Sequence, residues 1–151
     1  MSGDGPDRPD RAAGGPEAYE VRVLGYVRSP LTDPADAPRQ GDEGAPDAIL
    51  DLDPSYAPAL VGLSAGDEVV VLTWLHLGDR TGLQTHPRGD ASRPVAGVFA
   101  TRSPDRPNPI GLHRCPVIAV DGSRLTVAGL EAVDGTPVVD VKIALGEVAD
   151  R

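Results

Sequence analysis

The sequence has few of the features that mark several classes of protein. Its 151 residues include a single cysteine, Cys115, so no disulfide can form within the chain. No apolar run approaches the roughly 20 residues that a membrane-spanning helix needs, and the N-terminus carries no apolar signal region. We therefore expect a cytoplasmic protein that does not bind a membrane.

Aromatic residues are also scarce, at 3% of the chain, whereas there are 18 glycines and 16 prolines. This composition indicates a loop-rich, mainly β fold with an aliphatic core. Residues 1–18 are rich in Gly, Pro, Asp and Arg and lack apolar periodicity, which predicts a disordered tail before a single domain at 19–151. The formal net charge of −9 opposes broad attraction to nucleic acid, so any RNA contact would have to be local.

The apolar pattern predicts strands almost throughout. Apolar residues alternate from Tyr19 to Val27, and residues 68–77 are apolar enough for a central strand that is buried on both faces. Asp121-Gly122 between two apolar segments predicts a β-hairpin. Further expected elements are a strand at 48–52, a short helix near 59–63 and an apolar segment at 138–145. This order predicts a small, single-sheet antiparallel β-barrel with a few short peripheral helices, because closure removes unpaired edges.

Residues 102–109, here called the comb loop, contain three closely spaced prolines. Each proline fixes its own φ and moves the preceding residue out of the helical region, which predicts an extended, stiff loop. In that conformation Arg102, Asp105 and Asn108 would project from one edge. A stiff loop with these side chains is typical of a preorganised binding surface. A plain surface loop that proline keeps from fraying is the alternative.

Other common chemistries have little support in the sequence. His113 and Cys115 lie two residues apart with no further paired ligands nearby, so we expect no metal site. The nucleophile motif Gly-x-Ser-x-Gly, the Gly-x-Gly-x-x-Gly fingerprint and the Walker lysine motif are all missing. A nucleotide-like cofactor would therefore bind without a Rossmann fold.

Three blocks of the sequence resemble the motifs of the TsaA-like, or TrmO, family. They are Gly-Tyr-Val-Arg-Ser-Pro at 25–30 with Pro-Arg-Gln at 38–40, Phe-Ala-Thr-Arg-Ser-Pro at 99–104 with Arg-Pro-Asn-Pro-Ile-Gly-Leu at 106–112, and Asp-Gly-Thr-Pro-Val-Val-Asp-Val-Lys at 134–142. The resemblance covers roughly residues 20–145. It implies a small β-barrel N-methyltransferase that uses S-adenosyl-L-methionine, works as a homodimer and methylates N6 of threonylcarbamoyladenosine at position 37 of tRNA.

The resemblance also implies which residues hold the cofactor: Pro38, Arg39, Gln40, His76, Leu77, Arg102, Leu112, Asp134, Gly135, Thr136 and Pro137. The side chains expected to orient the methyl acceptor are Asp105, Asn108 and Asp134. Taken alone, Arg102 could equally be an ion-pair partner and Asp134 the start of a turn. Two other functions stay open, a transferase that uses the same cofactor on a small metabolite and a barrel that binds cofactor or RNA without turnover.

Overall fold

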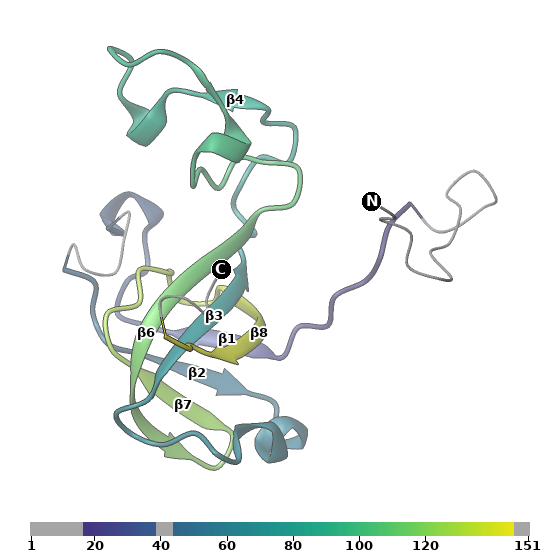
Figure 1. The fold of residues 1–151 in the computed structure, drawn as a ribbon, viewed down its shortest axis with the longest axis vertical. Helices are drawn as coiled ribbons and strands as arrows, with labels where there is room; N and C mark the ends of the chain where they lie inside the picture. The colour runs from purple at the N-terminus through teal and green to yellow at the C-terminus, as the bar shows by residue number, and fades with distance from the viewer. Residues whose placement is uncertain (1–16, 39–43, 147–151) are drawn as a thin grey trace.

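Six antiparallel strands form a closed barrel in the computed structural model, which describes residues 17–38 and 44–146. The strand order around the barrel is β1-β2-β7-β6-β3-β8, and β8 returns to pair with β1 (Figure 1). The strands are β1 (Gly25–Arg28), β2 (Ala48–Leu52), β3 (Glu68–Trp74), β6 (Ile110–Asp121), β7 (Arg124–Val127) and β8 (Pro137–Ile143). The predicted mainly-β antiparallel barrel is therefore confirmed.

The core fills the inside of the barrel with aliphatic side chains. Val69 and Val71 of β3, with Leu125 and Val127 of β7, have no exposed surface. In a small barrel the residues that point inward alternate with residues that point outward, and side chains fill the interior. The prediction that 68–77 is buried on both faces was wrong for this reason: β3 ends at Trp74, and its outer face is only half-buried.

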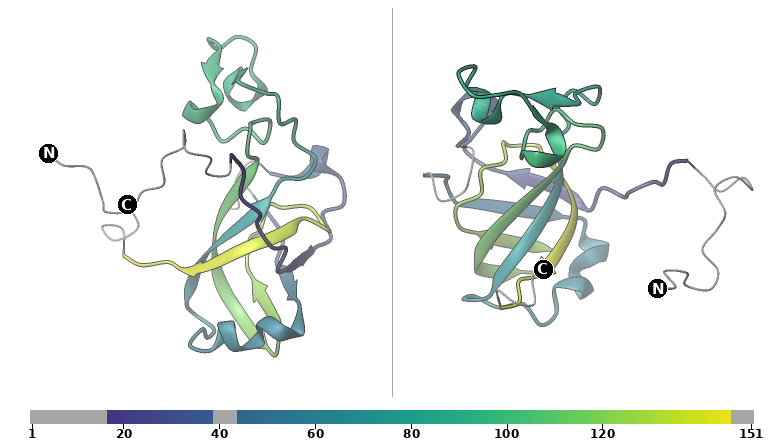
Figure 2. Two further views of the ribbon diagram at one scale, coloured as in Figure 1. Left: turned by 90° about the vertical axis from the view of Figure 1, so that its right-hand side faces the viewer. Right: turned by 45° about the horizontal axis from the view of Figure 1, so that its top comes forward.

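The first strand is shorter than predicted. It begins at Gly25 rather than Tyr19, and the side chains of Tyr19, Val21 and Val23 are exposed. The alternating pattern is present there, but a strand also needs a neighbour, and β2 and β8 pair with the chain only from Gly25 onward. In Figures 1 and 2 this segment runs away from the barrel. The predicted tail lies outside the described residues except for its last two.

The helices are short 3-10 turns. The helix predicted near 59–63 lies earlier, as η4 (Pro54–Leu60), and Asp53 caps its start by accepting a hydrogen bond from the Ser55 N–H at 2.9 Å. Pro58 inside this turn has no N–H to donate, which disfavours an α-helix. The other turns at 17–38 and 44–146 are η2 (Pro34–Asp36), η5 (Pro87–Gly89) and η6 (Val98–Ala100). Among the described residues no helix is both long and apolar enough to cross a membrane.

The predicted hairpin and a large excursion flank β6. Asp121 pairs with Arg124 across the turn, and Gly122 has the positive φ, 60°, that a tight hairpin requires. Between the paired strands β3 and β6, residues 75–109 leave the barrel and form what we call the upper lobe (Figures 1 and 2). The lobe contains a two-stranded ribbon of β4 (Gln84–Thr85) and β5 (Ala96–Gly97). The comb loop is the return path of this lobe into the barrel.

Candidate functional site

Segments from all three motif blocks meet at the end of the barrel that carries the upper lobe. Thr73, near the end of β3, is paired with Val138 of β8 on one side and with Gly111 of β6 on the other. Neighbouring strands lie about 4.8 Å apart, so the corner at 134–137 and the end of the comb loop join the barrel within about 10 Å of each other. His76 and Leu77 follow β3 between them, and both are exposed. The pairing of β3 with β6 and β8 thus brings together segments that lie far apart in the sequence.

The corner at 134–137 is tied to the chain that leaves β1. The Asp134 N–H donates to the Leu31 carbonyl at 2.6 Å, and the Gly135 N–H donates to the Val27 carbonyl at 2.8 Å. One carboxylate oxygen of Asp134 accepts the Ser29 N–H at 3.0 Å. The N–H of Thr136 donates to the Val133 carbonyl, so all three N–H groups of the corner already donate to carbonyls of the protein. The corner can therefore offer a ligand carbonyl and carboxylate oxygens, which accept hydrogen bonds from amino or ammonium groups.

Only the first part of the N-terminal block can be followed to the corner at 134–137. The chain runs from Leu31, which the corner holds, to Pro38, which is half-buried. Arg39 and Gln40 lie outside the described residues. Their predicted role in cofactor binding stays a prediction.

Arg106 folds back against the backbone of residues 98–103. Its guanidinium donates to the carbonyls of Val98 at 2.7 Å, Thr101 at 3.1 Å and Ser103 at 3.2 Å. The prolines of this loop have no N–H, and an arginine side chain supplies the donors that they lack. The loop avoids helix as predicted but bends at 104 and again at 106–108 instead of running straight.

The two candidate acceptor residues of the comb loop are braced against the start of the upper lobe. Asp105 accepts the Asp79 N–H at 2.8 Å. Asn108 accepts a hydrogen bond from Arg80 at 3.0 Å, and the Arg80 guanidinium lies 5.1 Å from the centre of the Trp74 ring. At Gly78 an added Cβ would lie 2.2 Å from the Pro104 carbonyl oxygen, so this close approach requires glycine. Asp105 and Asn108 therefore hold the loop in place, whatever else they do.

Arg102 and Leu112 are two predicted cofactor residues that are open to a ligand. Arg102 is exposed, and among the described residues its guanidinium has no hydrogen-bond or ion-pair partner. Leu112 lies on the outer face of β6 opposite Leu72 and is half exposed. An unpaired guanidinium suits a carboxylate, and an open apolar side chain suits a flat ring. These features fit an amino-acid nucleoside such as S-adenosyl-L-methionine.

Inside the barrel, near the end that carries the upper lobe, lies a buried polar network that the sequence did not predict. His113 is 5% exposed; its Nε2 lies 2.7 Å from the Thr73 hydroxyl, and its Nδ1 bonds the Glu131 carboxylate. A Cβ at Gly111 would lie 2.4 Å from the Thr73 hydroxyl oxygen, so glycine leaves room for the network. Nothing in the sequence pairs His113 with Glu131, 18 residues later. Among the described residues no three metal-ligating side chains gather into a metal site.

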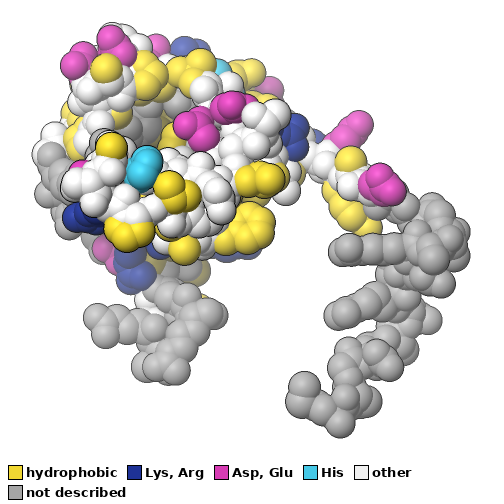
Figure 3. Space-filling model, turned by 90° about the horizontal axis from the view of Figure 1, so that it is seen from above, with side chains coloured by type: hydrophobic (Ala, Val, Ile, Leu, Met, Phe, Trp, Pro, Cys, Tyr) yellow, Lys and Arg dark blue, Asp and Glu magenta, His cyan; other side chains and the backbone are white. Residues whose placement is uncertain are grey.

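The surface offers two further features for comparison. From above, the upper lobe shows hydrophobic side chains among polar ones, with scattered acidic and basic groups rather than one continuous basic face (Figure 3).

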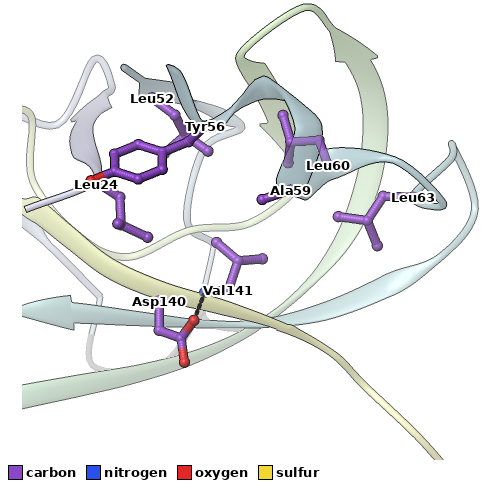
Figure 4. Close-up of a pocket in the computed structure, with 8 residues that line it drawn as sticks. All are labelled: Leu24, Leu52, Tyr56, Ala59, Leu60, Leu63, Asp140 and Val141. Atoms are coloured by element: carbon purple, nitrogen blue, oxygen red, sulfur yellow. Dashed lines mark hydrogen bonds between the residues drawn. The ribbon is translucent and has the colours of Figure 1, made fainter. Parts of the chain in front are cut away.

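On the side of the barrel, η4 and β8 line a small pocket of about 90 Å³ in which the Asp140 carboxylate accepts the Val141 N–H at 2.9 Å (Figure 4). That volume is well below the roughly 300 Å³ of a typical cofactor site. This pocket is no candidate for the cofactor.

Comparison with known sequences points to one family. The family described as the tRNA-methyltransferase O N-terminal domain matches residues 26–148. A relative from Methanothermobacter thermautotrophicus is 44% identical over 81% of this chain and 87% of its own length, and one from Halobacterium salinarum is 40% identical over 81% and 95%. Each of these relatives is named a probable S-adenosyl-L-methionine-binding protein.

A solved structure shares the fold. The crystal structure of TrmO from Pseudomonas aeruginosa superimposes with a TM-score of 0.68 at 33% sequence identity over 89% of this chain. This chain spans 60% of the length of that TrmO. The barrel, the motif blocks and the match at 26–148 agree, and the chain belongs to the family of the tRNA-methyltransferase O N-terminal domain.

Proposed function

We propose that this protein is an S-adenosyl-L-methionine-dependent methyltransferase whose acceptor is N6 of threonylcarbamoyladenosine at position 37 of tRNA. The observation that carries the proposal is the meeting of the three motif blocks near the end of β3. Thr73 pairs with Val138 and Gly111 of two blocks, and the N-terminal block joins them through the hydrogen bond from the Gly135 N–H to the Val27 carbonyl. The family match and the names of the relatives support the cofactor. The family and the TrmO structures support the RNA.

The residues at this end have distinct roles in the proposal. The cofactor supplies a methyl group on a positively charged sulfur, so the protein has to align the acceptor and remove one proton. The exposed Arg102 guanidinium holds the cofactor carboxylate, and the corner at 134–137 accepts hydrogen bonds from its amino groups. Asp105 and Asn108, fixed by Asp79 and Arg80, orient the acceptor from the comb loop with the groups that those bonds leave free.

Transfer of a labelled methyl group tests the reaction. The purified chain is incubated with methyl-labelled cofactor and either tRNA that carries unmethylated threonylcarbamoyladenosine or a small-molecule cell extract. Label in the tRNA is the expected result. Label only in small molecules would favour a metabolite as acceptor, the alternative that the net charge of −9 favours. Cofactor binding without transfer would reject the enzyme.

The variant Arg102→Ala tests the cofactor site. A charged hydrogen bond contributes about 1.5–3 kcal/mol, so we expect cofactor affinity to fall roughly 10- to 150-fold. The free energy of unfolding should stay within about 1 kcal/mol, because Arg102 is exposed and unpaired among the described residues. Arg124→Ala, at the opposite end of the barrel, is the matched control. Equal calorimetric affinities for the parent and Arg102→Ala would remove Arg102 from the site.

We also propose that the protein is a cytoplasmic homodimer. Ile110 and Ile118 are 47% and 42% exposed and leave apolar side chains on the outer face of β6 that a second copy would cover. Sedimentation velocity over a range of concentrations tests the assembly. A single monomeric species at every concentration would reject it.

A further inference from the structure

We propose that Phe99, in the upper lobe, is a stacking platform for an unpaired nucleobase of the RNA substrate; this rests on the proposed tRNA function. Phe99 is the one phenylalanine of the chain, and its side chain is 85% exposed. In a protein with 3% aromatic residues, this ring is left in solvent while the core is built from aliphatic side chains. Exposed aromatic rings are the usual surface on which proteins stack unpaired bases.

The backbone around Phe99 is fixed on both sides, so the ring projects from a fixed point of the chain. Val98 is buried, and its N–H donates to the Leu83 carbonyl at 3.0 Å. The Val98 carbonyl accepts three donors: the Thr101 N–H at 3.0 Å, the Thr101 hydroxyl at 2.9 Å and Arg106 at 2.7 Å. A backbone held this way needs no further ordering on binding, which favours affinity.

The three hydrogen bonds from Arg106 to backbone carbonyls, here called the polar clamp, join the ring to the candidate cofactor site. Arg106 bonds carbonyls at Val98, Thr101 and Ser103, so one side chain fixes the backbone on either side of both Phe99 and Arg102. A base on Phe99 and a cofactor held by Arg102 would therefore be bound by one fixed stretch of backbone. This placement suits a nucleotide next to the acceptor in a single-stranded loop.

The charges of the lobe favour RNA over a second copy of the chain as the partner. Residues 75–109 contain five arginines, three aspartates and no lysine or glutamate, although the whole chain carries −9. Phosphates are attracted to such a lobe, whereas two copies of it would repel each other. The upper face has no continuous basic surface (Figure 3). Stacking must then contribute much of the RNA affinity, as in other sequence-tolerant single-strand sites.

Substitutions of Phe99 test the platform, with kcat/KM for tRNA, cofactor affinity and sedimentation as measurements. Loss of one stacked base at about 1–3 kcal/mol predicts that Phe99→Ala lowers kcat/KM for tRNA roughly 5- to 150-fold with cofactor affinity and assembly unchanged. Phe99→Trp should restore activity and Phe99→Leu should not, because stacking needs a π-face. Val61→Ala removes a side chain that is equally exposed, 86%, at the far end of the barrel and should change nothing.

Other outcomes would overturn the platform. Recovery by Phe99→Leu, or a change of assembly in Phe99→Ala, would mean that the ring packs against protein. Full activity of Phe99→Ala with tRNA would mean that the ring does not touch the RNA. Failure of the proposed function is distinguishable from both, because the parent chain would then transfer no label to tRNA at all.

The lobe arginines give a second measurement. Arg88 and Arg93 are exposed in the turn around η5, and Arg93 lies 3.6 Å from Asp90. If the lobe faces RNA phosphates, Arg88→Gln with Arg93→Gln should reduce the slope of log affinity against log salt by about 0.7 per lost phosphate contact. Arg124→Gln, on the barrel, should leave the slope unchanged. An unchanged slope in the lobe variant would argue against this orientation.

Discussion

The barrel and the upper lobe hold their shapes by different forces. The barrel packs fully buried aliphatic side chains such as Val71, Leu125 and Val138. The lobe, residues 75–109, buries only Val98 and Pro109 and is held by side chains that bond backbone groups. Apolar packing tolerates exchange of similar side chains, whereas a polar clamp depends on individual donors and acceptors. The predicted site lies where the two regions join.

A substitution in the barrel core should have the largest effect on stability. Leu125→Ala removes a fully buried side chain, and we expect the free energy of unfolding to fall by about 2–5 kcal/mol. Denaturation in urea measures the change, and Val61→Ala, at an exposed position, should stay within about 0.5 kcal/mol. A loss at Leu125 smaller than the losses caused by lobe variants would break the comparison between the two regions.

Loss of the polar clamp should have a smaller and more local effect. Arg106→Met keeps the unbranched stem of the side chain but removes its bonds to three carbonyls, at a cost of about 1–3 kcal/mol. Amide exchange should accelerate at 97–109 while the strands stay protected. Arg106→Lys should not restore protection, because an ammonium cannot reproduce the planar fork of a guanidinium. Equal loss of protection in lobe and barrel would show that the two regions unfold together.

The difference between apolar packing in the barrel and polar contacts in the lobe also explains which features the sequence could predict. Alternating apolar residues and Asp121-Gly122 were enough to predict the barrel and its hairpin, because burial and turn geometry act locally. The spacing of the prolines predicted that the comb loop would avoid helix. Motif resemblance predicted only the roles of this loop and of the corner at 134–137 in the site, and those roles stay predictions. The clamp by Arg106 and the pair of His113 with Glu131 could not be predicted, because each depends on contacts made only in the folded chain. The strand predicted from Tyr19 was wrong because alternation does not reveal whether a partner strand exists.

Titratable groups in the two regions should respond to opposite ends of the pH scale. In the lobe, hydrogen bonds from Thr81 to Asp79 and from Ser92 to Asp90 lower the pKa of each carboxyl below 3.8. Their contribution to stability is present above that value and is lost as the pH falls through the lowered pKa. In the barrel, burial and the nearby Glu131 and Glu68 raise the pKa of the Cys115 thiol from 9.0 to about 12. Outside the lobe, hydrogen bonds from Ser55 lower the pKa of Asp53, the cap of η4, in the same way. Acid should therefore weaken the lobe and η4, and alkali the barrel interior.

The loss of stability at alkaline pH is the smallest of the expected effects, and it tests one barrel residue, Cys115. Between pH 9 and about 12 the folded thiol of Cys115 stays neutral while the unfolded thiol ionises, so unfolding releases a proton and stability falls as the pH rises. The expected loss is about 1 kcal/mol at pH 10. Cys115→Val keeps the packing volume without the titratable group, so its urea stability should decline less steeply above pH 9. Parallel declines in parent and variant would assign the alkaline loss to groups outside the barrel interior.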